Sequence, residues 1–328
     1  MSLTPVHLDP TGQVGLYQTE DRYFNLLRDK FGRRFLDYRT QWQDRSERLD
    51  WGQFPLSLDL AINSGCQLRC LMCPLPSRPD WADHRPMEEK LFDRLMAEAA
   101  EQGLPALTLG LGSEPLLNPR AARWIARAER SGIMDIRLGT NGLRLTWETA
   151  QALVDSGLTR LEISVDAARP ESYQAIRGGS LERLSANIEN FLETRQRLGS
   201  PWPLLRLSFL RLPQNMGELD DFLNRWEDQA DLVSIQEPIW FPGSGLPRPE
   251  KPGRPLAGSC AQPWQRLAVW SGGRVSPCCS WNGEELLPFD SRAGSIAAFW
   301  NSREMAQLRS ALSQGPENYP PACRNCEF

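Results

Sequence analysis

Three cysteines in the first quarter of the chain have the spacing of a site for soft metal, Cys66-x3-Cys70-x2-Cys73. Three thiolates this close can hold a [4Fe-4S] cluster and leave its fourth iron open to a small molecule. Structural zinc and free buried cysteines are the alternatives. Structural zinc takes four ligands, and no histidine lies in the motif. The triplet therefore predicts a cluster with one open iron.

A second set of cysteines lies near the carboxyl end of the sequence. Cys323-x2-Cys326 follows Cys260 and Cys278, and four such thiolates saturate a cluster. Zinc uses the same four ligands, so the spacing alone leaves both metals open. Cys279 is left over as the candidate catalytic residue, a thiol that returns a hydrogen atom to a substrate radical. The alternatives for it are a small buried residue or a substitute ligand.

The elements that must position these residues alternate between short apolar strands and helical stretches from Leu56 to Pro238. This pattern predicts six parallel strands joined by right-handed crossovers, which we expect to form a partial (β/α)6 TIM-like barrel. The cysteine triplet then follows the first strand at its carboxyl end, where barrel enzymes keep their active sites. The expected strands begin near Leu56, Ala106, Met134, Arg160, Leu204 and Leu232.

Each expected strand has one apolar face and one polar face. Leu58 and Leu60 oppose Ser57 and Asp59, and the other strands repeat this alternation. A closed eight-stranded barrel packs bulky side chains inside, so a polar interior predicts a wider or incomplete barrel around a polar ligand. A half-solvated sheet is the alternative, but parallel sheets are normally covered on both faces.

Further motifs follow the cysteine triplet in order, and together they resemble the radical SAM (S-adenosylmethionine) superfamily over Leu56 to about Pro238. The resemblance implies that Gly112-Ser113-Glu114-Pro115 meets the amino group of SAM and that Ser164-Val165-Asp166 holds its ribose. Arg177, within Tyr173 to Gly179, resembles the arginine that approaches the SAM carboxylate. Asn141 of Thr140-Asn141-Gly142 follows the third strand and completes the expected set. Two positions depart from the family pattern: Met72 stands where many relatives have an aromatic residue on the adenine, and Ser113 replaces the commoner glycine.

The same resemblance implies the chemistry of the first site. SAM binds the open iron, an electron from the reduced cluster breaks a carbon–sulfur bond, and the 5′-deoxyadenosyl radical removes hydrogen from substrate. A flavodoxin- or ferredoxin-type protein is the expected electron donor. The remaining sequence, from Gly258 to Phe328, resembles the shortened SPASM relative called twitch and implies an auxiliary [4Fe-4S] cluster. The expected cofactors are therefore SAM and two [4Fe-4S] clusters.

The expected organisation is a barrel over residues 56–240, a linker over 241–257 and a small α+β auxiliary-cluster domain over 258–328. Residues 1–55 form an extension with one expected helix, Tyr23 to Arg34, followed by a polar stretch. The auxiliary-cluster domain should contain a hairpin, Leu267 to Trp270 with Arg274 to Ser276, and a helix over Ile296 to Leu312.

A fully ligated auxiliary cluster cannot bind substrate, so we expect it to accept an electron and to make the reaction a net oxidation. Twitch-bearing relatives include an aminocyclitol dehydrogenase, and Leu36 to Trp42 with Phe54-Pro55 looks similar to radical SAM proteins of surface-sugar biosynthesis. The favoured reaction is therefore dehydrogenation of a sugar, polyol or other small polar substrate. The candidates for the proton acceptor are Glu162, Gln236 and Glu237, and those for stacking on a sugar, if they are not core residues, are tryptophans 240, 264, 270 and 281.

Two other functions stay open. Maturation of a ribosomally made peptide, by epimerisation or backbone cutting, would need a peptide substrate and a separate recognition protein. A non-catalytic iron–sulfur scaffold or electron carrier is the other. With a net charge of −4 and lysine only at Lys30, Lys90 and Lys251, the sequence has no basic tract to follow a phosphate backbone, so no nucleic-acid partner is expected. No apolar stretch is long enough for a bilayer, so no membrane partner and a cytoplasmic location are expected.

Overall fold

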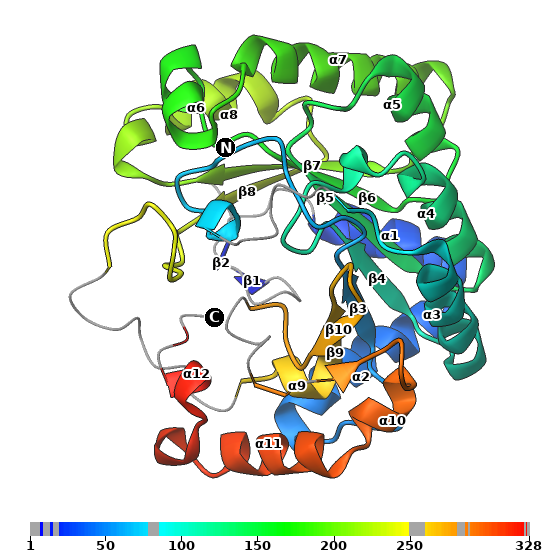
Figure 1. Cartoon of the computed structure of the whole chain (residues 1–328). Helices are drawn as coiled ribbons and strands as arrows, with labels where there is room; N and C mark the ends of the chain where they lie inside the picture. The colour runs from blue at the N-terminus through cyan, green and yellow to red at the C-terminus, as the bar shows by residue number, and fades with distance from the viewer. Residues whose placement is uncertain are drawn as a thin grey trace.

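The computed structural model describes residues 7–8, 14–15, 20–77, 85–248, 260–280, 286–287, 289–324 and 326. Its centre is a curved sheet in which six parallel strands follow one another in chain order (Figure 1). This arrangement confirms the partial (β/α)6 barrel expected from the sequence. The strands are β3 (Ser57–Leu60), β4 (Ala106–Leu109), β5 (Asp135–Thr140), β6 (Arg160–Ser164), β7 (Leu204–Leu210) and β8 (Leu232–Gln236).

Helices between the strands cover the outer face of the sheet (Figure 1). The apolar strand residues predicted to share one face, such as Leu60 and Leu161, belong to one buried core with Phe92 and Trp124 of the helices. Burial of these apolar side chains between the strands and the helices is the main favourable contribution to folding. The polar face of the strands therefore points into the interior of the barrel. The helices are α3 (Glu89–Gln102), α4 (Ala121–Arg130), α5 (Trp147–Val154), α6 (Pro170–Arg177), α7 (Leu181–Arg197) and α8 (Leu219–Trp226), and the short helical turns are η1 (Leu75–Ser77), η3 (Pro115–Leu117) and η4 (Pro213–Asn215).

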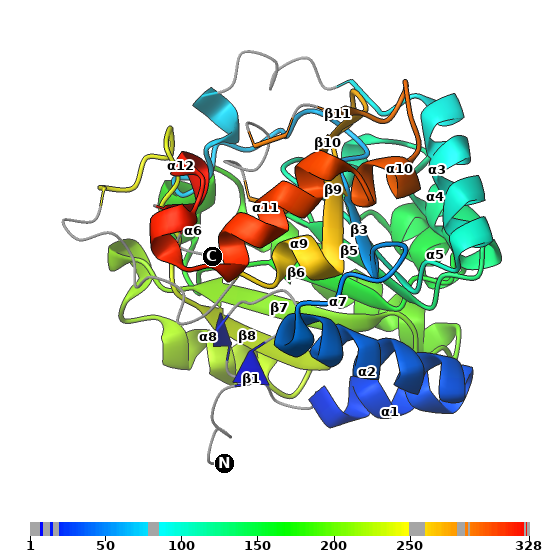
Figure 2. The same ribbon diagram turned by 90° about the horizontal axis from the view of Figure 1, so that it is seen from below.

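The amino-terminal extension forms two helices, α1 (Glu20–Phe31) and α2 (Arg33–Arg48), and the single helix expected over Tyr23 to Arg34 is wrong. Gly32 separates them with a left-handed φ of 57°. The expected polar stretch is helical because Phe35, Tyr38 and Trp42 form one apolar stripe. That stripe packs on the amino ends of the strands, at Leu56, Ala106, Met134 and Leu204. The extension therefore closes the amino-terminal end of the barrel (Figure 2).

The carboxyl-terminal region contains α9 (Gln262–Gln265), β9 (Arg266–Val269), β10 (Arg274–Ser276), β11 (Phe289–Asp290) and α12 (Pro321–Arg324). The expected hairpin is confirmed, because β9 and β10 pair antiparallel. The sequence did not predict that β9 also pairs parallel with β3, from Ser57 opposite Arg266 to Leu60 opposite Val269. The boundaries of the expected domains stay predictions, since one sheet runs through both regions.

The helix expected over Ile296 to Leu312 is two helices, α10 (Ile296–Trp300) and α11 (Arg303–Ser313). The break falls where Ser302 accepts a hydrogen bond from the Met305 N–H and so caps the start of α11. A short antiparallel pair, β1 (His7–Leu8) with β2 (Val14–Gly15), and the turn η6 (Pro316–Asn318) complete the fold. Across the described ranges, no helix combines the length and apolarity needed to cross a membrane.

Candidate functional site

The predicted cysteine triplet lies on the loop after β3, at the carboxyl end of the parallel strands. Backbone N–H groups point at its sulfurs: Leu68 N donates to Cys66 Sγ at 3.4 Å, and Leu75 N donates to Cys73 Sγ at 3.4 Å. Burial raises the pKa of Cys66 to about 12 and that of Cys73 to about 11. Without metal these thiols stay protonated at neutral pH, so metal binding must release their protons.

Polar side chains from other elements complete the surroundings of the sulfurs. Asn141 Nδ2 donates to Cys66 Sγ at 3.5 Å, and Arg177 Nη1 lies 3.7 Å from Cys70 Sγ. Gln67, which the sequence analysis missed, donates to Asn141 Oδ1 at 3.0 Å. Its place inside the motif, next to Cys66, was the available signal. Three half-buried thiols with N–H donors aimed at sulfur fit an iron–sulfur cluster.

Glu114 lies inside the protein, where only 1% of it is exposed. Its Oε1 accepts hydrogen bonds from Thr140 Oγ1 at 2.6 Å and Leu116 N at 2.9 Å, and its Oε2 accepts from Asn141 N at 2.8 Å. Burial raises the pKa of Glu114, and these donors counteract the rise. The carboxylate thus ties the loop after β4 to the loop after β5. Direct contact of Glu114 with SAM stays a prediction.

The other residues assigned to SAM lie around the same mouth. Gly112 adopts a left-handed φ of 53°, and the buried Ser113 Oγ has no hydrogen-bond partner within the described chain. An unpaired buried hydroxyl beside the cysteine loop fits a polar ligand such as SAM. Met72 and Ser164 are half-buried, Met72 on the cysteine loop and Ser164 at the end of β6.

Asp166 and Arg177 pair with each other. Asp166 is fully buried, and its Oδ2 accepts from Arg177 Nε at 2.7 Å and also from Nη2. Its Oδ1 accepts from Leu210 N at 2.8 Å. Burial alone would lower the pKa of Arg177, but Asp166 and Cys70 raise it. The carboxylate of Asp166 thus bonds to the protein itself, and contacts of Asp166 and Arg177 with SAM stay predictions.

The fold gathers Cys260, Cys278, Cys323 and Cys326 around one cavity with mainly apolar walls. Burial raises the pKa of Cys260 to about 12, that of Cys323 to about 11 and that of Cys278 well above its usual range. Among the residues whose positions are described, no three Cys, His, Asp or Glu side chains converge as ligands of a single metal ion. Four cysteines lining one cavity supply the four thiolates that a fully ligated [4Fe-4S] cluster takes.

Cys279 lines this second cavity together with the four expected ligands. Its Sγ lies 3.9 Å from Gln262 Oε1, and burial together with nearby Asp59 raises its pKa to about 12. The structure places Cys279 beside the auxiliary ligands, and this position favours the bystander or substitute-ligand interpretation over hydrogen donation.

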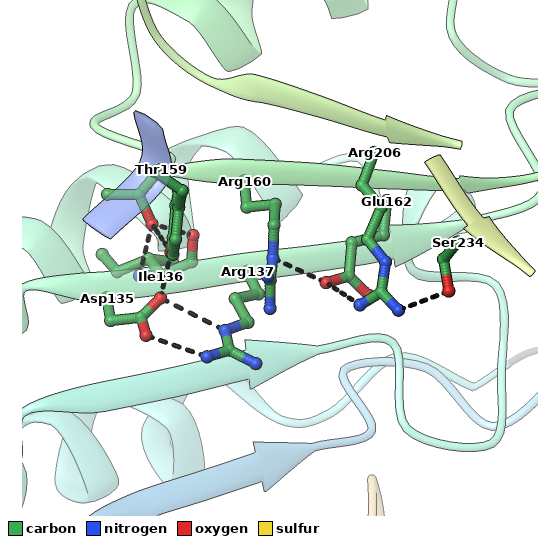
Figure 3. A network of polar contacts seen from close by, with 9 residues as sticks. Asp135, Ile136, Arg137, Thr159, Arg160, Glu162, Arg206 and Ser234 are labelled. Carbon is green, nitrogen blue, oxygen red and sulfur yellow. Dashed lines mark hydrogen bonds and ion pairs between the residues drawn. The ribbon is translucent and has the colours of Figure 1, made fainter. Parts of the chain in front are cut away.

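The inner face of the sheet carries a network of ion pairs (Figure 3). At its base, Arg137 pairs with Asp135 at 3.0 Å, and Tyr23 of α1 donates to the same carboxylate. Higher in the barrel, Glu162 Oε1 lies 2.7 Å from Arg160 Nε and 3.4 Å from Arg206 Nη1. The arginines are almost fully buried, whereas the side chain of Glu162 is 29% exposed.

Every half-exposed residue of strands β4 to β8 lies on this inner face. Solvent therefore reaches the polar interior that the alternation predicted. Among these half-exposed residues Glu162 carries the charged group, and several of the others carry hydroxyl or amide groups. The half-exposed residues are Thr108, Gly139, Glu162, Ser164, Ser208, Leu210 and Gln236.

Of the candidate tryptophans, Trp264 is buried and donates to Leu49 O at 2.9 Å, so it is a core residue. Trp240 and Trp270 are half-buried, and each donates its indole N–H, to Leu246 O and Ser276 Oγ respectively. Trp281 lies outside the described residues. Glu237 is exposed and pairs with Arg211.

Comparison with protein families gives two matches. Residues 60–200 match the radical SAM superfamily, and residues 260–327 match an iron–sulfur cluster-binding domain, SPASM. Together they confirm the expected cofactors, SAM and two [4Fe-4S] clusters.

Curated relatives include a GTP 3′,8-cyclase of Heliobacterium modesticaldum, 36% identical over 40% of this chain and 41% of the relative. Another, from Limosilactobacillus fermentum, is 33% identical over 54% of this chain and 52% of the relative. The chain thus spans about half the length of these curated relatives.

Solved structures share the fold at low sequence identity. Streptococcus suis SuiB bound to SAM superimposes with a TM-score of 0.60 at 15% identity, over 89% of this chain and 76% of SuiB. BtrN in complex with SAM and 2-DOIA gives a TM-score of 0.56 at 16% identity, over 84% of this chain and 93% of BtrN. At these identities the likeness establishes the architecture and no activity.

Proposed function

Because this chain belongs to the radical SAM superfamily, we propose that it is an oxidising member that dehydrogenates a hydroxyl-bearing carbon of a sugar, polyol or other small polar substrate. When bound, SAM and the two clusters supply the hydrogen-abstracting radical and the electron acceptor. The substrate loses one hydrogen atom from carbon, one proton from oxygen and one electron, and becomes a carbonyl compound. This chain's residues must therefore hold a hydroxyl group and receive its proton.

The observation that carries the proposal is the half-exposed carboxylate of Glu162 on the inner face. Two guanidinium groups hold it, and Arg206 is itself fixed by a hydrogen bond to Ser234 Oγ at 2.8 Å. Charge-assisted bonds of this kind fix the direction of the carboxylate, and its partial exposure on the inner face lets a substrate hydroxyl approach it. We propose Glu162 as the proton acceptor.

The neighbouring groups suit a substrate with several hydroxyls. Ser164 and Ser208 lie opposite each other on β6 and β7, and Gln236 lies at the end of β8. Hydroxyl and amide groups both donate and accept, so they can pair with sugar hydroxyls in either sense. The second site supports the same reaction, because four cysteines around one cavity leave no ligand position for substrate. We retain a flavodoxin- or ferredoxin-type protein as the proposed electron donor.

A nucleoside triphosphate is a second candidate substrate, because the curated relatives are named GTP 3′,8-cyclase. The neutral polyol is favoured because Ser164, Ser208 and Gln236, the groups beside Glu162 on the inner face, are uncharged hydrogen-bonding groups that match hydroxyls. A peptide is a third candidate, favoured by the likeness to SuiB bound to the precursor peptide SuiA. A separate recognition protein would then be the proposed partner.

The test uses the full chain, reconstituted anaerobically with iron and sulfide and supplied with SAM, dithionite and a polar metabolite extract. Mass spectrometry should find a polyhydroxylated metabolite that loses two hydrogen atoms for each 5′-deoxyadenosine formed, and the product should react with a hydrazine reagent. GTP or a synthetic peptide, tested in parallel, should not raise 5′-deoxyadenosine formation above the SAM-only rate. Selective consumption of GTP would replace the proposal with the second candidate.

A further inference from the structure

We propose that Arg177 and Asp166 together set the reduction potential of the cluster bound by Cys66, Cys70 and Cys73. Arg177 places a positive charge against one ligand sulfur. Asp166 fixes the position of that guanidinium and partly offsets its charge. This inference rests on the assignment of the first cluster to this loop and is independent of the substrate.

The end of α6 is docked on the cysteine loop through three contacts. Leu71 N donates to Ile176 O at 2.8 Å, Cys70 Sγ lies 3.8 Å from Arg177 O, and Arg177 Nη1 lies 3.7 Å from Cys70 Sγ. The side chain of Arg177 is only 14% exposed, so water screens its charge weakly. A guanidinium in this position favours the more negative, reduced state of the cluster.

Asp166 is built to hold that guanidinium. It adopts φ 61°, a left-handed conformation that is uncommon outside glycine. Three further contacts keep it there: Asp166 N donates to Ser208 O at 3.2 Å, Oδ1 accepts from Leu210 N, and Asp166 O accepts from Asn215 Nδ2 at 2.8 Å. These contacts fix the side chain of Asp166 in one direction. Here the result is that Oδ2 accepts from both Nε and Nη2 of Arg177.

The two charges predict opposite effects of substitution. Loss of the positive charge in Arg177→Gln makes the cluster harder to reduce, whereas Asp166→Asn removes the counter-charge and makes it easier to reduce. Asparagine tolerates the left-handed conformation, and with its amide oxygen turned toward Arg177 it still accepts from the guanidinium, although the bond from Leu210 N is lost. Arg177→Lys keeps the charge without the two-pronged contact, so its potential should lie between those of the wild type and Arg177→Gln.

The experiment is a redox titration of reconstituted full-length protein without SAM or substrate, followed by electron paramagnetic resonance. A Cys66→Ala/Cys70→Ala/Cys73→Ala variant, loaded only at the second site, identifies the auxiliary signal, which serves as an internal control. At the wild-type midpoint, Arg177→Gln should lower the ratio of reduced to oxidised first cluster about tenfold, a shift of about 59 mV for a one-electron couple. Asp166→Asn should raise the ratio by a similar factor.

The matched control is Arg169→Gln, an exposed arginine at the start of α6 that pairs with Asp221, and it should leave the potential unchanged. Equal potentials in Arg177→Gln, Asp166→Asn and wild type would overturn the inference. Shifts of the same sign in both variants would also overturn it, because they would indicate a distorted loop rather than a charge effect. Since the titration contains no substrate, a failure of the dehydrogenase proposal cannot produce either result.

Discussion

Glu114 Oε2 accepts the backbone N–H of Asn141 at 2.8 Å, and the amide of Asn141 in turn lies 3.5 Å from Cys66 Sγ. The acidic residue of the loop after β4 therefore reaches the cysteine loop through the turn after β5. This chain of contacts gives Glu114 a positioning role that its place in the sequence motif does not reveal.

Replacing Glu114 should weaken both SAM binding and the fold while leaving both clusters in place. Glu114→Ala leaves the N–H groups of Leu116 and Asn141 without their acceptor, which should lower the free energy of unfolding by about 1–3 kcal/mol. Denaturant unfolding and equilibrium SAM binding on the reconstituted protein measure the two effects. Glu237→Ala, at an exposed residue, is the control. Wild-type stability and affinity in Glu114→Ala would contradict the role of Glu114.

Metal content should follow the two cysteine sets. Two four-iron clusters predict about eight irons per chain after anaerobic reconstitution. Cys66→Ala/Cys70→Ala/Cys73→Ala should keep about half of the iron and lose SAM cleavage, because only the first cluster has an open iron. Iron and sulfide analysis measures the first outcome and chromatography of 5′-deoxyadenosine the second. Zinc at the second site of anaerobically purified protein would contradict the auxiliary cluster and the oxidation argument.

Glu162→Gln should lower product formation by about a hundredfold or more, the range of a lost general base, while SAM cleavage continues. The amide keeps the size of the side chain but cannot take the proton. The measurement is the amount of carbonyl product formed for each 5′-deoxyadenosine, which should fall in the variant. Glu237→Gln should behave as wild type, because Glu237 is exposed and pairs with Arg211. If Glu162→Gln formed as much carbonyl product per 5′-deoxyadenosine as the wild type, Glu162 would not be the proton acceptor.

Cys279→Ala should retain substrate oxidation, since Cys279 lies in the wall of the second cavity. Product made in heavy water should carry no new deuterium on the carbon that lost hydrogen, in either the wild type or the variant. Mass spectrometry of the product decides the point. Deuterium that appears with wild type and disappears with Cys279→Ala would replace oxidation with epimerisation.

Acid should destabilise the base of the barrel through Asp135. Burial alone would raise the pKa of Asp135, but Arg137, Arg160 and the Tyr23 hydroxyl bring it down to about 2. Because the folded pKa lies below the unfolded value, the stabilisation of about 2 kcal/mol is present above about pH 4 and is lost as the pH falls toward 2. Unfolding of Asp135→Asn should lack this pH dependence, whereas Asp29→Asn, at the exposed Arg28 pair, should keep it. If the free energy of unfolding of Asp135→Asn depended on pH as in the wild type, Asp135 would not be the source of the acid sensitivity.

The sequence by itself determined the features that depend on local spacing. The Cys66, Cys70 and Cys73 triplet predicted the first cluster, and the alternation along strands such as Arg160 to Ser164 predicted a sheet with a polar inner face. These features were readable because ligand spacing and the two-residue period of a strand involve neighbours in the chain. Both depend little on the rest of the fold.

Only the tertiary structure decided how distant segments meet. The pairing of β9 with β3, the packing of α2 under the strands and the docking of Arg177 on Cys70 join residues far apart in sequence. Hydrogen-bonding groups are present on every strand edge, and a charged side chain suits many partners. The choice among partners was therefore made by which arrangement buries the apolar faces together, and no local pattern carries that information.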